Sequence, residues 1–171
     1  TLLLWKAPAK MAKPPAVSGL QPAYSKELVE TLERQARGHG SAVRGLVAFS
    51  AAKSACLSCH KLGMHGGTVG PDLTKIGKDR KPAEIIESIL WPKRHVKPEY
   101  QTQVIVTNNG RSHRGYIVRE SPTEVAIRDP TKGPKHTLVI ASSDIDFRRV
   151  AGTLMPDNWA AALTNAQLND V

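Results

Sequence analysis

The sequence is poor in several of the residues on which small proteins often depend. Its 171 residues include only two cysteines, and its histidines are scattered singly, so a zinc site made from two paired sets of ligands is excluded. Aromatic residues make up only 5% of the chain, so aromatic side chains supply little of the apolar area of any core. No apolar run approaches the roughly 20 residues that a transmembrane helix needs, so we expect no membrane-spanning segment.

The first 40 residues show little organisation. The chain begins Thr1-Leu2-Leu3-Leu4-Trp5 without an initiator methionine, and this stretch is too short for a signal peptide, so we expect a fragment whose export signal lies elsewhere or was removed. Residues 6–23 are rich in proline, alanine and lysine, which is typical of an extended linker. Ser25 is a suitable N-cap for a helix over residues 25–37. We interpret residues 1–40 as a linker and short helix that precede the main domain.

The strongest chemical pattern is Cys56-Leu57-Ser58-Cys59-His60, because C-x-x-C-H is the attachment sequence for c-type haem. On a helix, residues at i, i+3 and i+4 share one face, so the side chains of Cys56, Cys59 and His60 point the same way. The two thiols can add to the two vinyl groups at one porphyrin edge, and the imidazole can then reach the iron. We predict one covalent haem c, with His60 as a metal ligand.

Two other uses of a C-x-x-C sequence were weighed against haem. A redox motif normally lies near a βαβ pattern, and none is visible here. A disulfide between Cys56 and Cys59 would close almost no loop and would add little stability. Haem attachment is therefore the favoured interpretation.

The residues on both sides of the motif resemble those of small monohaem c-type cytochromes. Gly45 and Phe49 precede it on a predicted helix that begins at Ser41, and the resemblance implies that this helix packs against the last helix of the fold. A glycine inside a helix is costly, which independently predicts that another helix crosses closely at Gly45.

A loop with four glycines follows His60 and ends in Gly70-Pro71-Asp72-Leu73, which also matches the cytochromes. Such a loop lets the backbone approach a flat ligand. The resemblance implies that the Pro71 carbonyl accepts a hydrogen bond from the outer ring nitrogen of His60, the partner that a ligating histidine needs. The alternative for Pro71 is an ordinary turn proline. The implied haem contacts in this region are Gly70, Pro71, Leu73 and Ile76.

A second predicted helix begins at Pro82 and ends at Trp91-Pro92. A buried tryptophan usually finds a hydrogen-bond partner, so Trp91 is a candidate donor to a haem propionate, and a core tryptophan without haem contact is the equal alternative. Tyr100 is a further candidate haem contact on the resemblance.

From Tyr100 onward the apolar residues alternate, and Asn108-Asn109-Gly110 is a hairpin turn signal. The pattern predicts a small antiparallel β-barrel or meander over residues 100–150, with strands near 101–106, 115–118, 124–128 and 137–140 and a fifth at 145–149. The predicted fold class is α+β: a helical cytochrome c fold made from residues 41–99 and 151–171, with this β-module inserted. Residues 151–171 hold a distal-ligand loop and the start of a closing helix, for which Thr164 and Gln167 form a capping box. We expect this helix to be cut or to continue beyond Val171.

Four residues compete for the second axial position on the iron. Met11 lies in the linker, and ordering it would cost conformational entropy. Met64 is four residues beyond His60, so it spans at most about 14 Å and would have to round the porphyrin edge, and His65 meets the same limit. Met155 meets no such limit, and the resemblance implies that a Met-Pro segment before the last helix supplies the sulfur ligand. We predict Met155.

The pieces that match extend the resemblance to the haem-binding domains of large planctomycete proteins, which join dehydrogenase-type propellers to a cytochrome. It implies one-electron transfer by a non-enzymatic module of a larger oxidoreductase, with a redox protein or adjoining dehydrogenase domain as partner, in the periplasm or otherwise exported. One alternative is a sensor or peroxidase-like haem domain with an open sixth site. Another is a β-module that docks a partner or contacts carbohydrate. The matching pieces are Cys56–His60, Gly70–Leu73, Ser88-Ile89-Leu90 with Pro92, Tyr100, Asn109-Gly110, Gly115 and Met155-Pro156.

The net charge of +9 is compatible with this interpretation. The positive residues are spread along the chain and do not form the single stripe that nucleic-acid binding favours. We therefore predict no nucleic-acid partner, and we expect the basic groups to face solvent, haem propionates or acidic redox partners.

Overall fold

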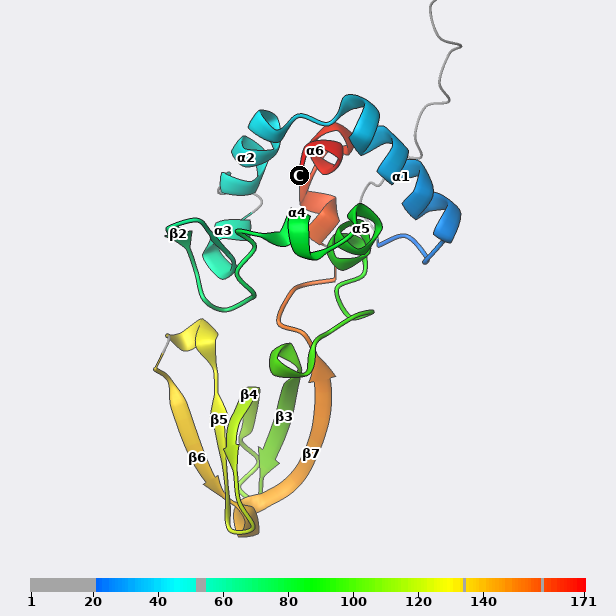
Figure 1. Cartoon of the computed structure of the whole chain (residues 1–171). Coiled ribbons are helices and arrows are strands. Elements are labelled where there is room, and N and C mark those ends of the chain that lie inside the picture. The colour runs from blue at the N-terminus through cyan, green and yellow to red at the C-terminus, as the bar shows by residue number, and fades with distance from the viewer. Residues whose placement is uncertain (1–20, 52–54, 134, 158) are drawn as a thin grey trace, which may run out of the picture.

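A computed structural model describes residues 21–51, 55–133, 135–157 and 159–171. Met11 and all but the last three residues of the predicted linker therefore lie outside the described residues. Helices gather at one end of the molecule and a five-stranded antiparallel sheet forms the other, with the chain passing between them before β3 and after β7 (Figure 1). The α+β class is confirmed. The five described strands form an open sheet with β6 and β7 at its edges, so the barrel form of the prediction is not supported.

The helices begin where the sequence predicts suitable caps. Ser25 Oγ accepts a hydrogen bond from the Leu28 backbone N–H at 3.2 Å, and Thr164 Oγ1 accepts one from the Gln167 N–H at 3.2 Å. The described α-helices are α1 (Lys26–His39), α2 (Ala42–Ser50), α3 (Cys56–Cys59), α4 (Ile76–Asp79), α5 (Pro82–Leu90) and α6 (Asn165–Asp170).

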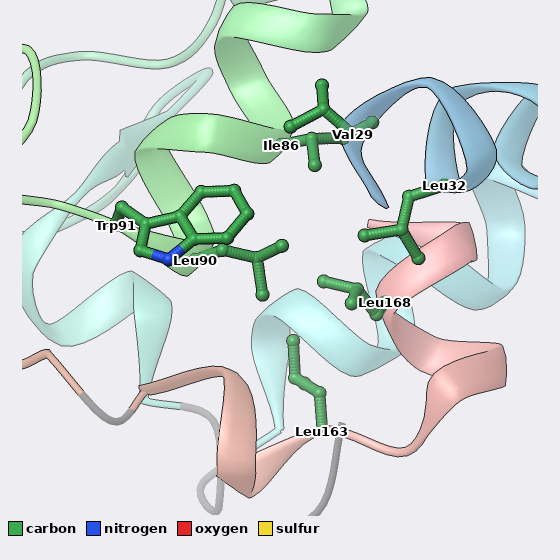
Figure 2. Close-up of a cluster of buried hydrophobic side chains, with 7 residues drawn as sticks. All are labelled: Val29, Leu32, Ile86, Leu90, Trp91, Leu163 and Leu168. Carbon is green, nitrogen blue, oxygen red and sulfur yellow. The ribbon is translucent and has the colours of Figure 1, made fainter. Parts of the chain in front are cut away.

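The helical core joins α1 to α5 and α6 (Figure 2). Leu90 is fully buried, and each fully buried side chain of this size contributes about 1.5–3 kcal/mol. Two residues of α1 belong to this core, so α1, expected to precede the domain, packs against α5 and α6. The core residues are Val29, Leu32, Ile86, Leu90, Trp91, Leu163 and Leu168.

The close helix crossing predicted at Gly45 is confirmed, between α2 and α6. A Cβ added at Gly45 would lie 1.9 Å from the Asp170 carbonyl oxygen, so only glycine fits. The Asp170 carboxylate, whose side chain is 4% exposed, accepts hydrogen bonds from the Ser41 N–H at 2.9 Å and from Arg44 Nε and Nη2 at 2.8 Å. These bonds tie the start of α2 to the end of α6.

The prediction that the helix opened by Ser41 would carry the cysteine motif is wrong. That helix, α2, ends at Ser50, and the motif lies on the separate one-turn helix α3. Ala55 precedes α3 in the left-handed conformation, with φ 48°, which redirects the chain. His60 follows α3 as its C-cap, in extended conformation.

Five predicted strands are present, and their order in the sheet is β6-β5-β4-β3-β7. Neighbours along the chain pair as hairpins from β3 to β6, and β7 returns to pair with β3. The side chains of Ile105, Val125, Ile127 and Ile140 form a second core on the sheet. The strands are β3 (Thr102–Thr107), β4 (Ser112–Glu120), β5 (Glu124–Arg128), β6 (Thr137–Ala141) and β7 (Ile145–Gly152).

Candidate functional site

The two cysteines stand at the two ends of α3. Both side chains are half-buried and are not joined in a disulfide. Their i, i+3 spacing on one helical turn places the two thiols on one face. The backbone N–H of His60 donates to the Cys56 carbonyl at 2.9 Å, which fixes the start of the next segment against the helix.

The loop after His60 folds back onto α3. A short hairpin of β1 (Lys61–Leu62) and β2 (His65–Gly66) opens it. Three loop N–H groups then donate at 2.8 Å, Gly67 to the Leu57 carbonyl, Gly70 to the Cys59 carbonyl and Leu73 to the Lys61 carbonyl. These bonds place the loop beside the cysteine helix.

The His60 imidazole is held on two sides. Its Nδ1 lies 2.9 Å from the Pro71 carbonyl oxygen, the hydrogen bond that the resemblance implies. Because a carbonyl only accepts, Nδ1 carries the proton and Nε2 carries the lone pair that a metal needs. The Gly70 backbone packs on the ring so closely that a Cβ there would lie 2.6 Å from Cε1. The ring plane and the tautomer are therefore both set by the protein.

An acidic residue stabilises the same loop. Hydrogen bonds from the Thr74 hydroxyl and N–H lower the pKa of Asp72, so this carboxylate is ionised at neutral pH. Thr74 Oγ1 in turn accepts a hydrogen bond from the Gly63 N–H at 2.8 Å. Lys61 Nζ lies 3.5 Å from the carboxylate, in an exposed pair of little energetic weight.

The sheet also contacts the loop, through Tyr116 on β4. This side chain is 5% exposed, and its hydroxyl donates to the Val69 carbonyl at 3.0 Å, directly before Gly70. The Tyr100 ring meets the Tyr116 ring edge to face at 6.2 Å. Burial raises the pKa of Tyr116, and the nearby Tyr100 and Cys59 raise it further, so the hydroxyl keeps its proton. The contact of Tyr116 was not predicted from the sequence. The one signal that could have suggested it is the general rule that a buried tyrosine hydroxyl needs a hydrogen-bond partner.

Met155 lies just beyond β7 and is half-buried. Its N–H donates to Thr153 Oγ1 at 3.1 Å. Arg114 on β4 donates through Nη2 to the carbonyls of Thr153 at 2.7 Å and Ala151 at 3.2 Å. By contrast, Met64 stands at the tip of the β1–β2 hairpin, where 94% of it is exposed. Sequence analysis missed Arg114, because nothing local distinguishes it from a solvated strand residue.

Trp91 has another partner than the predicted one. Its Nε1 donates to the Pro22 carbonyl at 2.7 Å, and its ring meets Tyr24 edge to face at 5.1 Å within the helical core. The single indole donor is therefore used inside the protein, which favours the alternative of a core tryptophan over donation to a propionate. Leu73 and Ile76, the latter at the start of α4, are half-buried, and their contact with a haem face stays a prediction.

Neither a family model nor a curated protein matches the sequence. Within the described ranges, no group of three or more His, Cys, Asp or Glu side chains is arranged to hold a metal ion. No helix in the described part of the chain is both long and apolar enough to cross a bilayer.

Proposed function

We propose that this chain is a monohaem c-type cytochrome module that transfers single electrons. The observation that carries the proposal is the His60 ring, fixed by the Pro71 carbonyl and the Gly70 backbone directly after two half-buried thiols on one helical turn. In this proposal Cys56 and Cys59 form the thioethers that hold the haem, and His60 Nε2 is the first axial ligand.

The residues present fit such a group. A ligating histidine needs its outer nitrogen bonded to an acceptor, and His60 has that bond to the Pro71 carbonyl. The α2–α6 crossing at Gly45 supports a cytochrome-type fold for the helical part, in which a first and a last helix cross. The inserted sheet would then be an addition to that fold.

For the second axial ligand we propose the Met155 sulfur. The exposure of Met64 leaves it without contacts that could hold it near a porphyrin, and His65 is exposed as well. Met155 is half-buried, on a segment held by hydrogen bonds from Arg114. Met/His ligation raises the potential of a haem relative to other ligand sets, which suits an acceptor.

When bound, the haem would supply an iron that takes up one electron from a reduced partner and returns to the ferric state when it passes the electron on. His60 and Met155 would both hold the iron, and they would leave it no open position for a substrate. We therefore propose an electron carrier rather than an enzyme, exported from the cytoplasm and served by a redox protein or an adjoining dehydrogenase domain.

The test is expression of the chain with a haem c maturation system. We expect haem to stay with the chain on a denaturing gel, and C56A/C59A protein to be colourless. Extraction of the haem from the unmutated chain by acid and organic solvent would contradict the proposal.

The ligand set is tested on the same preparation. M155A should lose the far-red sulfur-to-iron band of the ferric protein and bind carbon monoxide when reduced, whereas M64A, the matched control, should do neither. If the unmutated ferrous protein binds carbon monoxide readily, the sixth position is open, and the sensor or peroxidase-like alternative replaces electron transfer.

A further inference from the structure

We propose that Arg114 and Tyr116, two residues apart on β4, are positioning residues for the two segments that carry the axial ligands. The inference rests on the proposed function. It gives the inserted sheet a role that the sequence left open, because one strand would set the position of both ligand segments.

Tyr116 acts on the histidine side. Its hydroxyl donates to the Val69 carbonyl at 3.0 Å, and the Pro71 carbonyl two residues later binds His60 Nδ1 at 2.9 Å. Gly70, between them, packs on the imidazole ring. A shift of the Val69 carbonyl therefore moves both groups that orient the ring.

Arg114 acts on the methionine side. Its Nη2 donates to the carbonyls of Ala151 and Thr153, and its Nε donates to Thr102 Oγ1 at 3.3 Å. Thr102, which is fully buried, donates to the Gly152 carbonyl at 2.8 Å. The three successive carbonyls of residues 151–153 are thus held from β3 and β4, and the last of these residues, Thr153, also accepts the Met155 N–H through its Oγ1.

The strand that carries both residues is well placed to do this. Side chains at i and i+2 share one face of a strand, so Arg114 and Tyr116 lie on the same side of β4. β4 is an inner strand, paired with β3 through Val104 and Arg114 and with β5 through Tyr116 and Arg128. Pairing on both edges limits the movement of β4, so the same rigid strand positions both ligand segments.

The experiment uses the haem-loaded full chain and measures the effect on the Met155 segment and the effect on the His60 ring separately. Exogenous imidazole competes with Met155 for ferric iron, so its affinity reports how well the methionine is held. R114Q should raise that affinity about tenfold, the effect expected when hydrogen bonds from a charged group are lost. R114K, which keeps the charge but not the planar fork, should fall between R114Q and wild type.

Two controls separate positioning from a general loosening of the fold. R119Q removes an arginine of the same strand that pairs with Glu124 and contacts neither ligand segment, and it should leave imidazole affinity unchanged. In an M155A background, R114Q should have no further effect, because no methionine is left to compete. A tenfold rise in that background as well would overturn the distal part of the inference.

On the histidine side, Y116F removes only the hydroxyl. It should change the pattern of haem methyl shifts in the paramagnetic proton NMR spectrum, which reports the plane of the His60 ring, and leave imidazole affinity within about twofold. Y24F, which removes the hydroxyl that donates to Glu87, is the matched control and should leave the pattern unchanged.

The outcomes distinguish this inference from the proposed function. A wild-type chain without covalent haem overturns both. A wild-type chain with methionine-ligated haem, whose R114Q, R114K and Y116F variants all behave as the controls do, overturns the inference alone.

Discussion

Replacing Gly70 with alanine is the most direct perturbation of the way His60 is held. The added Cβ would lie 2.6 Å from Cε1 and 2.9 Å from Nδ1 of the ring. Non-bonded carbon atoms lie about 3.5–4.0 Å apart, so the ring has to move by about 1 Å. A movement of that size takes Nδ1, now 2.9 Å from the Pro71 carbonyl oxygen, out of good hydrogen-bond geometry.

Loss of the outer-nitrogen partner of a ligating histidine typically weakens metal binding about 10–100-fold. That factor corresponds to about 1.4–2.7 kcal/mol. We therefore expect G70A to lower the free energy of unfolding of the haem-loaded protein by about this amount. Guanidinium unfolding followed at the Soret band measures the stability, and the ferric spectrum should gain a high-spin component at neutral pH.

Gly77 supplies the matched control. It lies in α4, and a Cβ there would meet nothing within 4 Å. G77A should therefore leave the haem spectrum unchanged and stability equal or up to about 1 kcal/mol higher, since alanine favours helix over glycine. A G70A protein with wild-type spectrum and stability, or a G77A protein equally damaged, would refute the argument that the Gly70 backbone holds the ring.

Two further predictions concern the α2–α6 contact. G45A should lower the free energy of unfolding by about 1–3 kcal/mol, because its Cβ would overlap the Asp170 carbonyl. In the control G38A the added Cβ meets nothing within 4 Å, so this variant should be neutral or slightly stabilising. Thermal unfolding compares the two variants, and equal effects on stability would contradict the close helix crossing. Hydrogen bonds from Arg44 lower the pKa of Asp170, so the contact should stabilise the fold above that depressed pKa and weaken as pH falls through it. D170N should reduce the difference in melting temperature between pH 7 and pH 3, and an unchanged difference would count against this pair.

Features encoded by a few neighbouring residues were predictable. The alternation of apolar residues located all five strands, because each strand needs only its own pattern and a turn signal. The caps at Ser25 and Thr164 located two helix starts for the same reason. The hydrogen bond between His60 and Pro71 was predictable only through the resemblance, since eleven residues separate the two partners.

Features that depend on distant partners were not predictable. α1 packs in a core that it shares with α5 and α6. The narrow apolar stripe of α1 shows that the helix packs on something, but it does not identify the helices that it packs against. Trp91 was expected to need an acceptor, but no local pattern pointed to the Pro22 carbonyl. Arg114 and Tyr116 make their contacts 37 to 47 residues away along the chain, where no local pattern reaches.

If Met155 is the ligand that we propose, the sheet explains how a methionine so far along the chain from His60 can be held in place. Closing a flexible loop costs entropy that rises only with the logarithm of the loop length, so a long insertion is tolerated. A flexible connection would nevertheless leave Met155 without a fixed position. The pairing of β3 with β7 removes that freedom, since Thr102 lies opposite Gly152 where the chain enters and leaves the sheet. The Met155 segment therefore starts from a point that strand pairing fixes, beside the Tyr100–Tyr116 contact that reaches the His60 loop. In the proposed cytochrome the insertion separates the two ligand segments in sequence, while Arg114 and Tyr116 of β4 bond to one segment each.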